Sequence, residues 1–174
     1  MQALTKEELL ALLGEARRHR ERDWLMLATG FHFGLRVSEL TEFTPDAVQD
    51  GFLTIQRKKG SNRTIQEIPQ HENPLLDIRN ALIGFCALKP RNLPVFPMSE
   101  SWLRRLMQRY GAAVGIAKHK LHPHCLKHSL AMLTIATAGI ENVRQHLGHK
   151  SISSTGAYLK VTDAAASKAV RGAL

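Results

Sequence analysis

The sequence has few cysteines and no long hydrophobic segment, and these absences exclude several classes of protein. Its 174 residues contain two cysteines, Cys86 and Cys125, which form no Cys-x-x-Cys pair. Neither a disulfide framework nor a cysteine-based zinc site is indicated. No apolar run approaches the roughly 18 residues that a membrane-spanning helix needs, and the N-terminus lacks the basic-then-apolar order of a signal peptide. We therefore expect a cytoplasmic protein that makes no contact with a membrane.

Acidic residues are also scarce relative to basic ones. Against 15 acidic residues stand 24 lysines and arginines, which gives a net charge of +9 and a pI near 10. Such a charge is compatible with simple solubility, but in an intracellular domain it favours a polyanionic partner, with nucleic acid first. An apolar content of 44% over this length predicts one globular domain, residues 1–174.

The spacing of apolar residues predicts an α+β fold that is mainly helical with one small antiparallel sheet. Helical periodicity runs through 4–19, 22–34, 37–43, 73–88 and 99–115, and from residue 122 onward in three or four pieces broken at Gly139 and Gly148. Thr5 is expected to cap the first helix, and Asn73 the fourth, with Pro74 at its first position. Residues 51–70 alternate around a Lys-Gly-Ser-Asn turn, which predicts a β-hairpin.

Three basic side chains fall on one face of the helix predicted after residue 122. His124, Lys127 and His128 stand at i, i+3 and i+4. On its own this pattern favours an ordinary solvated face, and a functional site is the alternative. The spacing of the two histidines also occurs in zinc helices, but Cys125 occupies the position where such a helix carries its glutamate. We therefore predict no metal site.

The segment "GLRVSEL" places Arg36 at a junction between two helices. Glu39 follows three residues later and is positioned to hold the guanidinium. The pair is either an ordinary surface ion pair, which contributes little to stability, or a planar fork held ready for a phosphate group.

Two further groups of basic residues are ambiguous on their own. The predicted hairpin tip "RKKGSNR" carries Arg57, Lys58, Lys59 and Arg63, and it is either a soluble loop or a device that delivers cations to a nucleic-acid groove. The predicted helix 99–115 carries Arg104, Arg105 and Arg109 along one edge, which is either solvated or in contact with phosphates.

The segment "LGHKSISSTGAY" separates a histidine from a tyrosine by a run of small, mostly hydroxylic residues. Gly148 suits the end of a helix, so His149 is expected in a turn between two helices. A helix capped by Ser151 places Tyr158 on its polar side, whereas a structural tyrosine normally lies on the apolar side.

In their order and spacing, these segments together resemble the catalytic domain of the tyrosine recombinases, the phage-integrase and Xer-type family. The resemblance runs from about residue 4 to 165 and rests on "FGLRVSEL", the lysine-glycine turn of "KGSNRTIQEIP", "HCLKH", "LGH", and the tyrosine nine residues after that last histidine.

The resemblance implies site-specific DNA strand breakage and rejoining through a 3′-phosphotyrosyl intermediate, without metal, ATP or other cofactor. It assigns Tyr158 as nucleophile, Lys59 as general acid, His124 as base or hydrogen-bond partner, and Glu39 as a support behind the site. Contacts with the scissile phosphate are assigned to Arg36, Lys127 and His149. Residues expected to contact DNA elsewhere are Arg57, Lys58, Arg63, Arg104 and Arg105.

Two departures from the family pattern leave alternatives open. Lys127 stands where the family has its second catalytic arginine, so the chain is either an active variant or a weakened or non-catalytic DNA-binding relative; type IB topoisomerase-like relaxation is a third hypothesis. The family's N-terminal core-binding and arm-binding domains are expected to be absent from this chain. The partners implied are double-stranded DNA and further copies of the chain, as a dimer or tetramer on DNA, with a monomer off DNA and a location at the nucleoid.

Overall fold

The computed structural model describes residues 3–58, 60–151 and 155. Its α-helices are α1 (Lys6–His19), α2 (Glu21–His32), α3 (Val37–Glu42), α4 (Arg79–Ala87), α5 (Glu100–Ala113), α6 (His124–Ala138) and α7 (Ile140–His146). Its strands are β1 (Val48–Gln49), β2 (Phe52–Ile55) and β3 (Thr64–Glu67), and two short 3-10 helices, η1 (Pro45–Ala47) and η2 (Lys118–Lys120), complete the set.

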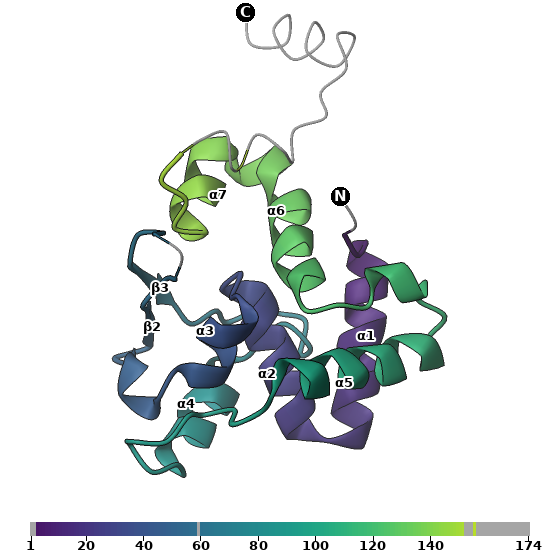
Figure 1. Ribbon diagram of the computed structural model, residues 1–174, viewed down its shortest axis with the longest axis horizontal. Coiled ribbons are helices and arrows are strands. Elements are labelled where there is room, and N and C mark those ends of the chain that lie inside the picture. The colour runs from purple at the N-terminus through teal and green to yellow at the C-terminus, as the bar shows by residue number, and fades with distance from the viewer. Residues whose placement is uncertain (1–2, 59, 152–154, 156–174) are drawn as a thin grey trace, which may run out of the picture.

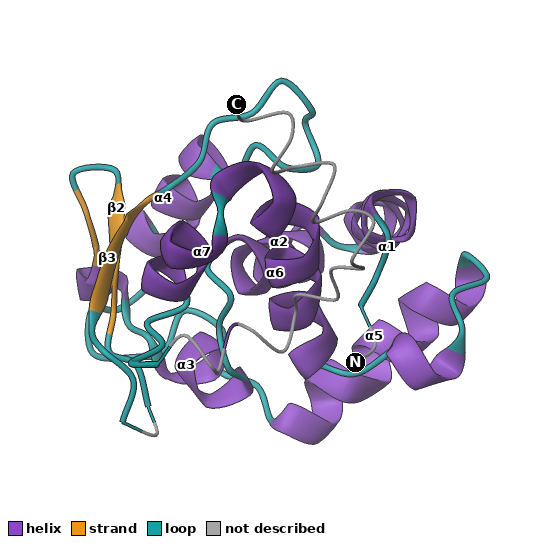
Figure 2. Ribbon diagram, turned by 90° about the horizontal axis from the view of Figure 1, so that it is seen from above, coloured by secondary structure: helices purple, strands orange, loops and turns teal. Residues whose placement is uncertain are grey.

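Helices α2 and α6 form the centre of the fold, with the sheet and α4 to one side and α1 and α5 to the other (Figure 1). The view from above shows the same order, with the strands at one edge of the helical body (Figure 2). Every residue of α2 from position 23 to 31 is buried, as expected for a helix covered on several sides. The predicted α+β class, mainly helical with a small antiparallel sheet, is confirmed.

The start of α1 follows directly from its sequence. The Thr5 hydroxyl accepts a hydrogen bond from the Glu8 amide at 3.1 Å, and the Glu8 carboxylate accepts one from the Thr5 amide at 2.8 Å. This reciprocal cap satisfies two amide groups that the first turn of a helix leaves free. Arg20 is extended and separates α1 from α2, so the two helices pack against each other as neighbours.

The predicted hairpin is present and is joined by a third strand. Strands β2 and β3 pair antiparallel with Leu53 opposite Gln66 and Ile55 opposite Thr64, and β1 pairs with the outer edge of β2. Strand β1 has two residues and is therefore too short to show an alternating pattern in the sequence.

Helix α4 begins later than the sequence predicts. Asn73 does cap a turn, because its side-chain oxygen accepts the Leu75 amide at 2.9 Å, but the helix starts only at Arg79. The carbonyl groups of Pro74 and Leu75 instead accept hydrogen bonds from Arg17, at 2.8 Å, and from the Trp24 indole, at 2.9 Å. These tertiary contacts with α1 and α2 compete with helix formation over 73–78.

The breaks predicted at Gly139 and Gly148 are confirmed. Both residues have a positive φ, 79° and 68°, which glycine adopts without steric strain. Gly139 separates α6 from α7. Gly148 lies two residues after the last residue of α7, in the turn that leads to His149. Among the described residues, no helix combines the length and apolar character needed to cross a membrane.

Candidate functional site

Arg36 lies at the junction of α2 and α3, as predicted, and its guanidinium is held from two sides. Its Nη1 donates to a Glu39 oxygen at 2.8 Å and to the Lys58 carbonyl at 3.0 Å, and its Nη2 donates to the Ser61 hydroxyl at 3.0 Å. The side chain keeps 19% of its surface exposed. The pair is therefore not a loose surface ion pair but a guanidinium fixed by α3 and the hairpin loop, with part of it open to a ligand.

Arg57 is not on the surface of the hairpin tip, which corrects the expectation that it contacts DNA. Its side chain has no exposed surface. The guanidinium donates to the carbonyls of Phe33, Gly34 and His146 at 2.8–3.1 Å. It also donates to the Thr64 hydroxyl at 3.2 Å and to Glu39 at 3.2 Å. Arg57 thus joins the ends of α2 and α7 to α3 and the sheet, and a cation suits those carbonyl-rich helix ends.

The sequence contained a signal for this burial. Residues two apart along an extended chain point to the same face, and Leu53 and Ile55 are both buried. Extending the alternation by one step places Arg57 on that inner face. The four cations of the tip suggested an exposed loop, so the alternating pattern was not extended to Arg57.

The turn after α7 fixes His149. The Gly148 carbonyl accepts the Asn62 amide at 2.9 Å, which ties the turn to the hairpin. A Cβ on Gly148 would meet the Asn62 carbonyl at 2.7 Å and the Arg57 stem at 3.0 Å, so both the positive φ and the close approach require glycine. The His149 amide donates to the Arg144 carbonyl at 3.0 Å, and the Arg144 guanidinium donates back to the His149 carbonyl at 2.8 Å.

The imidazole of His149 is neutral at physiological pH. Burial, and then the charge of Lys127 followed by those of Arg36, Arg57 and Arg144, lowers its pKa to about 4. Its Nδ1 lies 2.9 Å from the Thr155 hydroxyl, a partner that the sequence did not indicate. When that hydroxyl donates, Nε2 carries the proton. A neutral His149 is then still able to donate a hydrogen bond to an anion.

Lys127 is buried, which corrects the interpretation of the face it shares with His124 and His128 as solvated. Lys127 is 6% exposed, and its Nζ has no hydrogen-bond partner among the described residues. Burial, and then the charges of Arg57 and Arg36, lowers its pKa to about 7 against the smaller opposing effect of Glu39. The covered part of α6 is its first half, where the neighbours of Lys127, among them Leu126 and Leu130, are buried as well.

Replacing Lys127 with methionine is expected to raise the free energy of unfolding by about 1–3 kcal/mol at pH 7, because it removes a buried polar group that lacks a partner. The folded pKa of about 7 lies below the ordinary value of 10.5, so the unfolded chain binds more protons between these values. The stability of the wild type therefore rises with pH above 7. Urea denaturation at pH 7 and pH 9 measures both effects. The advantage of Lys127→Met should shrink toward pH 9, and equal pH dependence in the two proteins would contradict the assignment.

His124 opens α6 and is exposed, within a group of three histidines. Burial lowers the pKa of both His122 and His128, and His124 is the charge that lowers each of them further. Arg104 acts on His122 in the same way, so the middle of α5 lies close to the start of α6. Arg36, Lys127 and His149 come from three segments, the α2–α3 junction, α6 and the turn after α7, and the charges of Arg36 and Lys127 both act on His149.

The sequence suggested that the arginines of α5 share one edge of the helix, but the structure places them on two different sides. Arg104 lies toward the histidines and pairs with Glu100 at 3.6 Å. Arg105 and Arg109 instead line a separate cleft of about 280 Å³ together with Arg20, over Trp102 and Tyr110. DNA contact by Arg105 stays a prediction.

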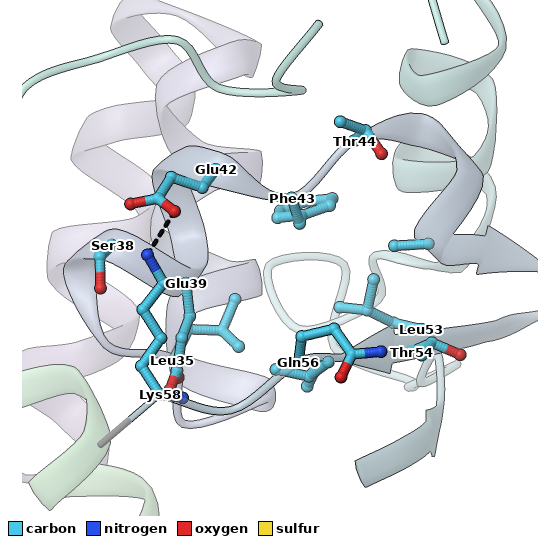
Figure 3. Close-up of a pocket in the computed structure, with 12 residues that line it drawn as sticks. Leu35, Ser38, Glu39, Glu42, Phe43, Thr44, Leu53, Thr54, Gln56 and Lys58 are labelled. Carbon is cyan, nitrogen blue, oxygen red and sulfur yellow. Dashed lines mark hydrogen bonds and ion pairs between the residues drawn. The ribbon is translucent and has the colours of Figure 1, made fainter. Parts of the chain in front are cut away.

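Lys58 and a cavity lie behind the site. The cavity, of about 250 Å³, lies between α3 and β2, and both apolar side chains, such as Leu53, and polar side chains, such as Glu39 and Gln56, line it (Figure 3). Lys58 forms an ion pair with Glu42 beside it, with 44% of the lysine side chain exposed. DNA contact by Lys58 would therefore compete with Glu42. Arg63 is exposed at the base of the hairpin tip, and Lys59 lies outside the described residues.

The chain has two tyrosines, and the structure describes one of them. The Tyr110 hydroxyl donates to buried Asp23 at 2.8 Å, and burial, followed by this hydrogen bond and the charge of Asp23, raises the pKa of Tyr110 to about 12. Tyr110 is 3% exposed and therefore unsuited to nucleophilic attack. Tyr158 lies outside the described residues.

The charges of Arg36 and Lys127 both act on His149, so these three hydrogen-bond donors lie near one another, and Glu39 pairs with both Arg36 and Arg57 beside them. This arrangement suits an anion with several oxygens, such as a phosphodiester. In the described part of the chain, no three His, Cys, Asp or Glu side chains gather as metal ligands would.

Comparison with known proteins agrees with this arrangement. The chain matches the Phage integrase family over residues 2–165. It is 32% identical over 170 residues to the tyrosine recombinase XerA of Pyrococcus furiosus, which covers 92% of this chain and 57% of that relative. The chain thus spans little more than half the length of the curated relatives it matches.

Solved structures show the same fold. The XerH site-specific recombinase bound to its difH substrate superimposes with a TM-score of 0.73 at 19% identity, over 98% of this chain and 54% of that one. The catalytic domain of bacteriophage HP1 integrase gives a TM-score of 0.70 at 21% identity, over 98% and 94%. On the match across nearly its whole length, the chain belongs to the phage integrase family, the tyrosine recombinases.

Proposed function

We propose that this chain breaks and rejoins DNA strands in site-specific recombination through a 3′-phosphotyrosyl intermediate. The observation that carries the proposal is the cluster of two basic side chains, Arg36 and Lys127, with the neutral donor His149, and Glu39 holds Arg36 and Arg57 in this cluster. The Nζ of Lys127 is buried, and no acceptor among the described residues bonds to it. The other tyrosine of the chain is locked against Asp23, which leaves Tyr158 as the available nucleophile.

The reaction begins with attack of the Tyr158 oxygen on the scissile phosphorus. The bond from phosphorus to the 5′-oxygen breaks, and Lys59 donates a proton to that oxygen. The tyrosine proton passes to His124. Arg36, Lys127 and His149 donate to the non-bridging oxygens, where negative charge develops, and pre-aligned donors of this kind are a large source of rate enhancement. The assignments of Lys59, His124 and Tyr158 rest on the family motifs.

The phosphotyrosyl bond retains the energy of the broken phosphodiester, so rejoining needs no ATP. A 5′-hydroxyl attacks the phosphorus, the tyrosine leaves, and the proton transfers run in reverse. In this proposal, cationic side chains supply the charge at the phosphate, and the reaction is expected to proceed in EDTA. Attack by a hydroxyl from a second duplex gives recombination, whereas attack by the original strand gives topoisomerase-like relaxation.

The proposed partners are double-stranded DNA and further copies of the chain. XerH is described bound to difH, and lambda integrase as a dimer on a core site and as a tetramer on a Holliday junction. By likeness to these proteins we propose that this chain also assembles as a dimer or tetramer on DNA. Its net charge of +9 supports binding to the phosphate backbone.

Arg104→Ala is expected to weaken DNA binding by a salt-dependent amount. Arg104 is 54% exposed and lies on the side of α5 that faces the histidines. Loss of one phosphate contact should reduce the slope of log K against log salt by about one. Fluorescence anisotropy on a labelled duplex between low and moderate salt measures this slope. Arg18→Ala, an exposed arginine on α1, is the matched control. An unchanged slope for Arg104→Ala would remove it from the interface.

A nicked suicide duplex tests the proposal itself, because loss of the short strand traps the covalent intermediate. On a denaturing gel, the wild type and Tyr110→Phe should form a protein–DNA adduct with the cognate site, and Tyr158→Phe should form none. Tyr110→Phe is the control for loss of a tyrosine hydroxyl. Binding of the site without adduct in the wild type would favour a non-catalytic DNA-binding relative.

A further inference from the structure

The charges around Lys127 do not balance. Of the described groups that act electrostatically on its Nζ, Arg57 and Arg36 are cationic and Glu39 alone is anionic. Arg36 stands at the α2–α3 junction, Glu39 lies in α3, and Arg57 follows β2. With Lys127 protonated, the cluster therefore has three positive charges and one negative charge.

Glu39 has no capacity left for Lys127. One of its oxygens accepts Arg36 Nη1 at 2.8 Å and the Lys58 amide at 3.0 Å. The other accepts the Arg36 amide at 2.9 Å and Arg57 Nη1 at 3.2 Å. A carboxylate offers about four acceptor sites, and four donors occupy them.

Lys127 itself is confined where it stands. Its stem lies 3.8 Å from the position of a Cβ on Gly34, and its Nζ is buried without a hydrogen-bond partner among the described residues. A buried ammonium without acceptors is unfavourable, and such a group either loses its proton or gains an anion. Arg36, whose charge acts on Lys127, keeps 19% of its side chain exposed, and we take this as the side from which an anion reaches the lysine.

Within the described part of the chain, Lys127 acts electrostatically on three histidines. His128 lies on α6 itself, His146 ends α7 and His149 follows it. Burial is the largest cause of the lowered pKa of all three. These histidines therefore stay neutral above pH 7. Within the described part of the cluster, Lys127 is then the group whose charge changes above pH 7.

We propose that Lys127 takes up a proton when a tetrahedral oxyanion, the scissile phosphodiester in the proposed function, binds between Arg36, Lys127 and His149. The proton comes from solvent and forms the ammonium, which then donates to an anion oxygen. The inference rests on the proposed function for the identity of the anion. An arginine at this position would stay charged at any relevant pH, so proton coupling is a property of the lysine.

The lowered pKa of Lys127, about 7, supports this coupling. Above that pH, anion affinity should fall by about tenfold for each pH unit, since one proton must be bound with the anion. With arginine at position 127 the same affinity should be nearly constant between pH 7 and 9.

NMR of the full chain with lysine labelled at Cε and Nζ tests the proposal, with inorganic sulfate as the probe. Sulfate does not itself titrate in this range. The Lys127 resonance is identified by its absence in Lys127→Arg, or in Lys127→Met if the first variant does not fold. In chloride, this resonance should titrate near neutral pH. In sulfate at equal ionic strength, its midpoint should rise by more than one pH unit.

Lys118 and Lys120 are the internal controls and should not respond to the change of anion; Lys120 already pairs with Glu8 at 2.8 Å. Two results would overturn the proposal: a titration midpoint of Lys127 equal to that of the exposed lysines, or an equal Lys127 midpoint in chloride and in sulfate. The two proposals fail separately. A normal tyrosine adduct without a sulfate-dependent midpoint rejects proton coupling alone, and a sulfate-dependent midpoint without any adduct rejects strand transfer.

Discussion

Arg57→Met is expected to lower the free energy of unfolding by about 3–5 kcal/mol, the range for removing one partner from a buried, hydrogen-bonded ion pair. The guanidinium donates to three carbonyl groups, one hydroxyl and Glu39. Methionine fills similar space but leaves all five acceptors without this donor. Helix ends α2 and α7 lose their common contact with the sheet, so the loss should appear as global destabilisation. Urea denaturation followed by circular dichroism measures it.

Arg63→Met is the matched control, because Arg63 belongs to the same hairpin and is exposed. Its effect should stay within about 0.5 kcal/mol. Arg57→Lys is expected to be destabilised as well, since one ammonium is unable to reach all the acceptors of a planar guanidinium. Wild-type stability of Arg57→Met, combined with weaker DNA binding, would instead place Arg57 at the DNA surface.

Arg36→Ala is expected to slow strand cleavage by about 100- to 1,000-fold, the effect typical of removing one aligned donor to developing negative charge. Glu39, Ser61 and the Lys58 carbonyl fix this guanidinium before any ligand binds. The protein therefore spends little free energy on ordering it in the transition state. Single-turnover adduct formation on the suicide duplex, with enzyme in excess, measures the rate.

Global stability should change less in Arg36→Ala than in Arg57→Met, because Arg36 is partly exposed and Glu39 retains Arg57 as a partner. Arg18→Ala is the control for loss of an exposed arginine. Cleavage by Arg36→Ala within about twofold of the wild type would contradict the role proposed for Arg36 in transition-state stabilisation.

The sequence predicted best where local spacing determines geometry. The Arg36–Glu39 pair requires only a helix start between the two residues, and the position of His149 requires only a glycine at the end of α7. The cap of α1 by Thr5 and Glu8 is equally local. Such features depend on neighbours three or four residues away and are visible in a single segment.

Other features depended on contacts between distant segments. Helix α4 begins at Arg79 because α1 and α2 use the carbonyl groups of Pro74 and Leu75. Lys127 is buried because the α2–α3 junction and the turn after α7 cover α6. The saturation of Glu39 needs Arg57 to fold inward from the sheet. None of these partners lies within the segment whose structure it changes.

Tyr158 is the central residue of the proposed reaction, and the attachment point of DNA tests it most directly. Trypsin separates the two tyrosines of the chain, leaving Tyr110 in residues 110–118 and Tyr158 in residues 151–160. After digestion of the trapped adduct with nuclease and trypsin, mass spectrometry should find a nucleotide linked through its 3′-phosphate to peptide 151–160. A nucleotide on peptide 110–118, a 5′-linkage, or specific binding of the cognate site with no modified peptide would contradict the account.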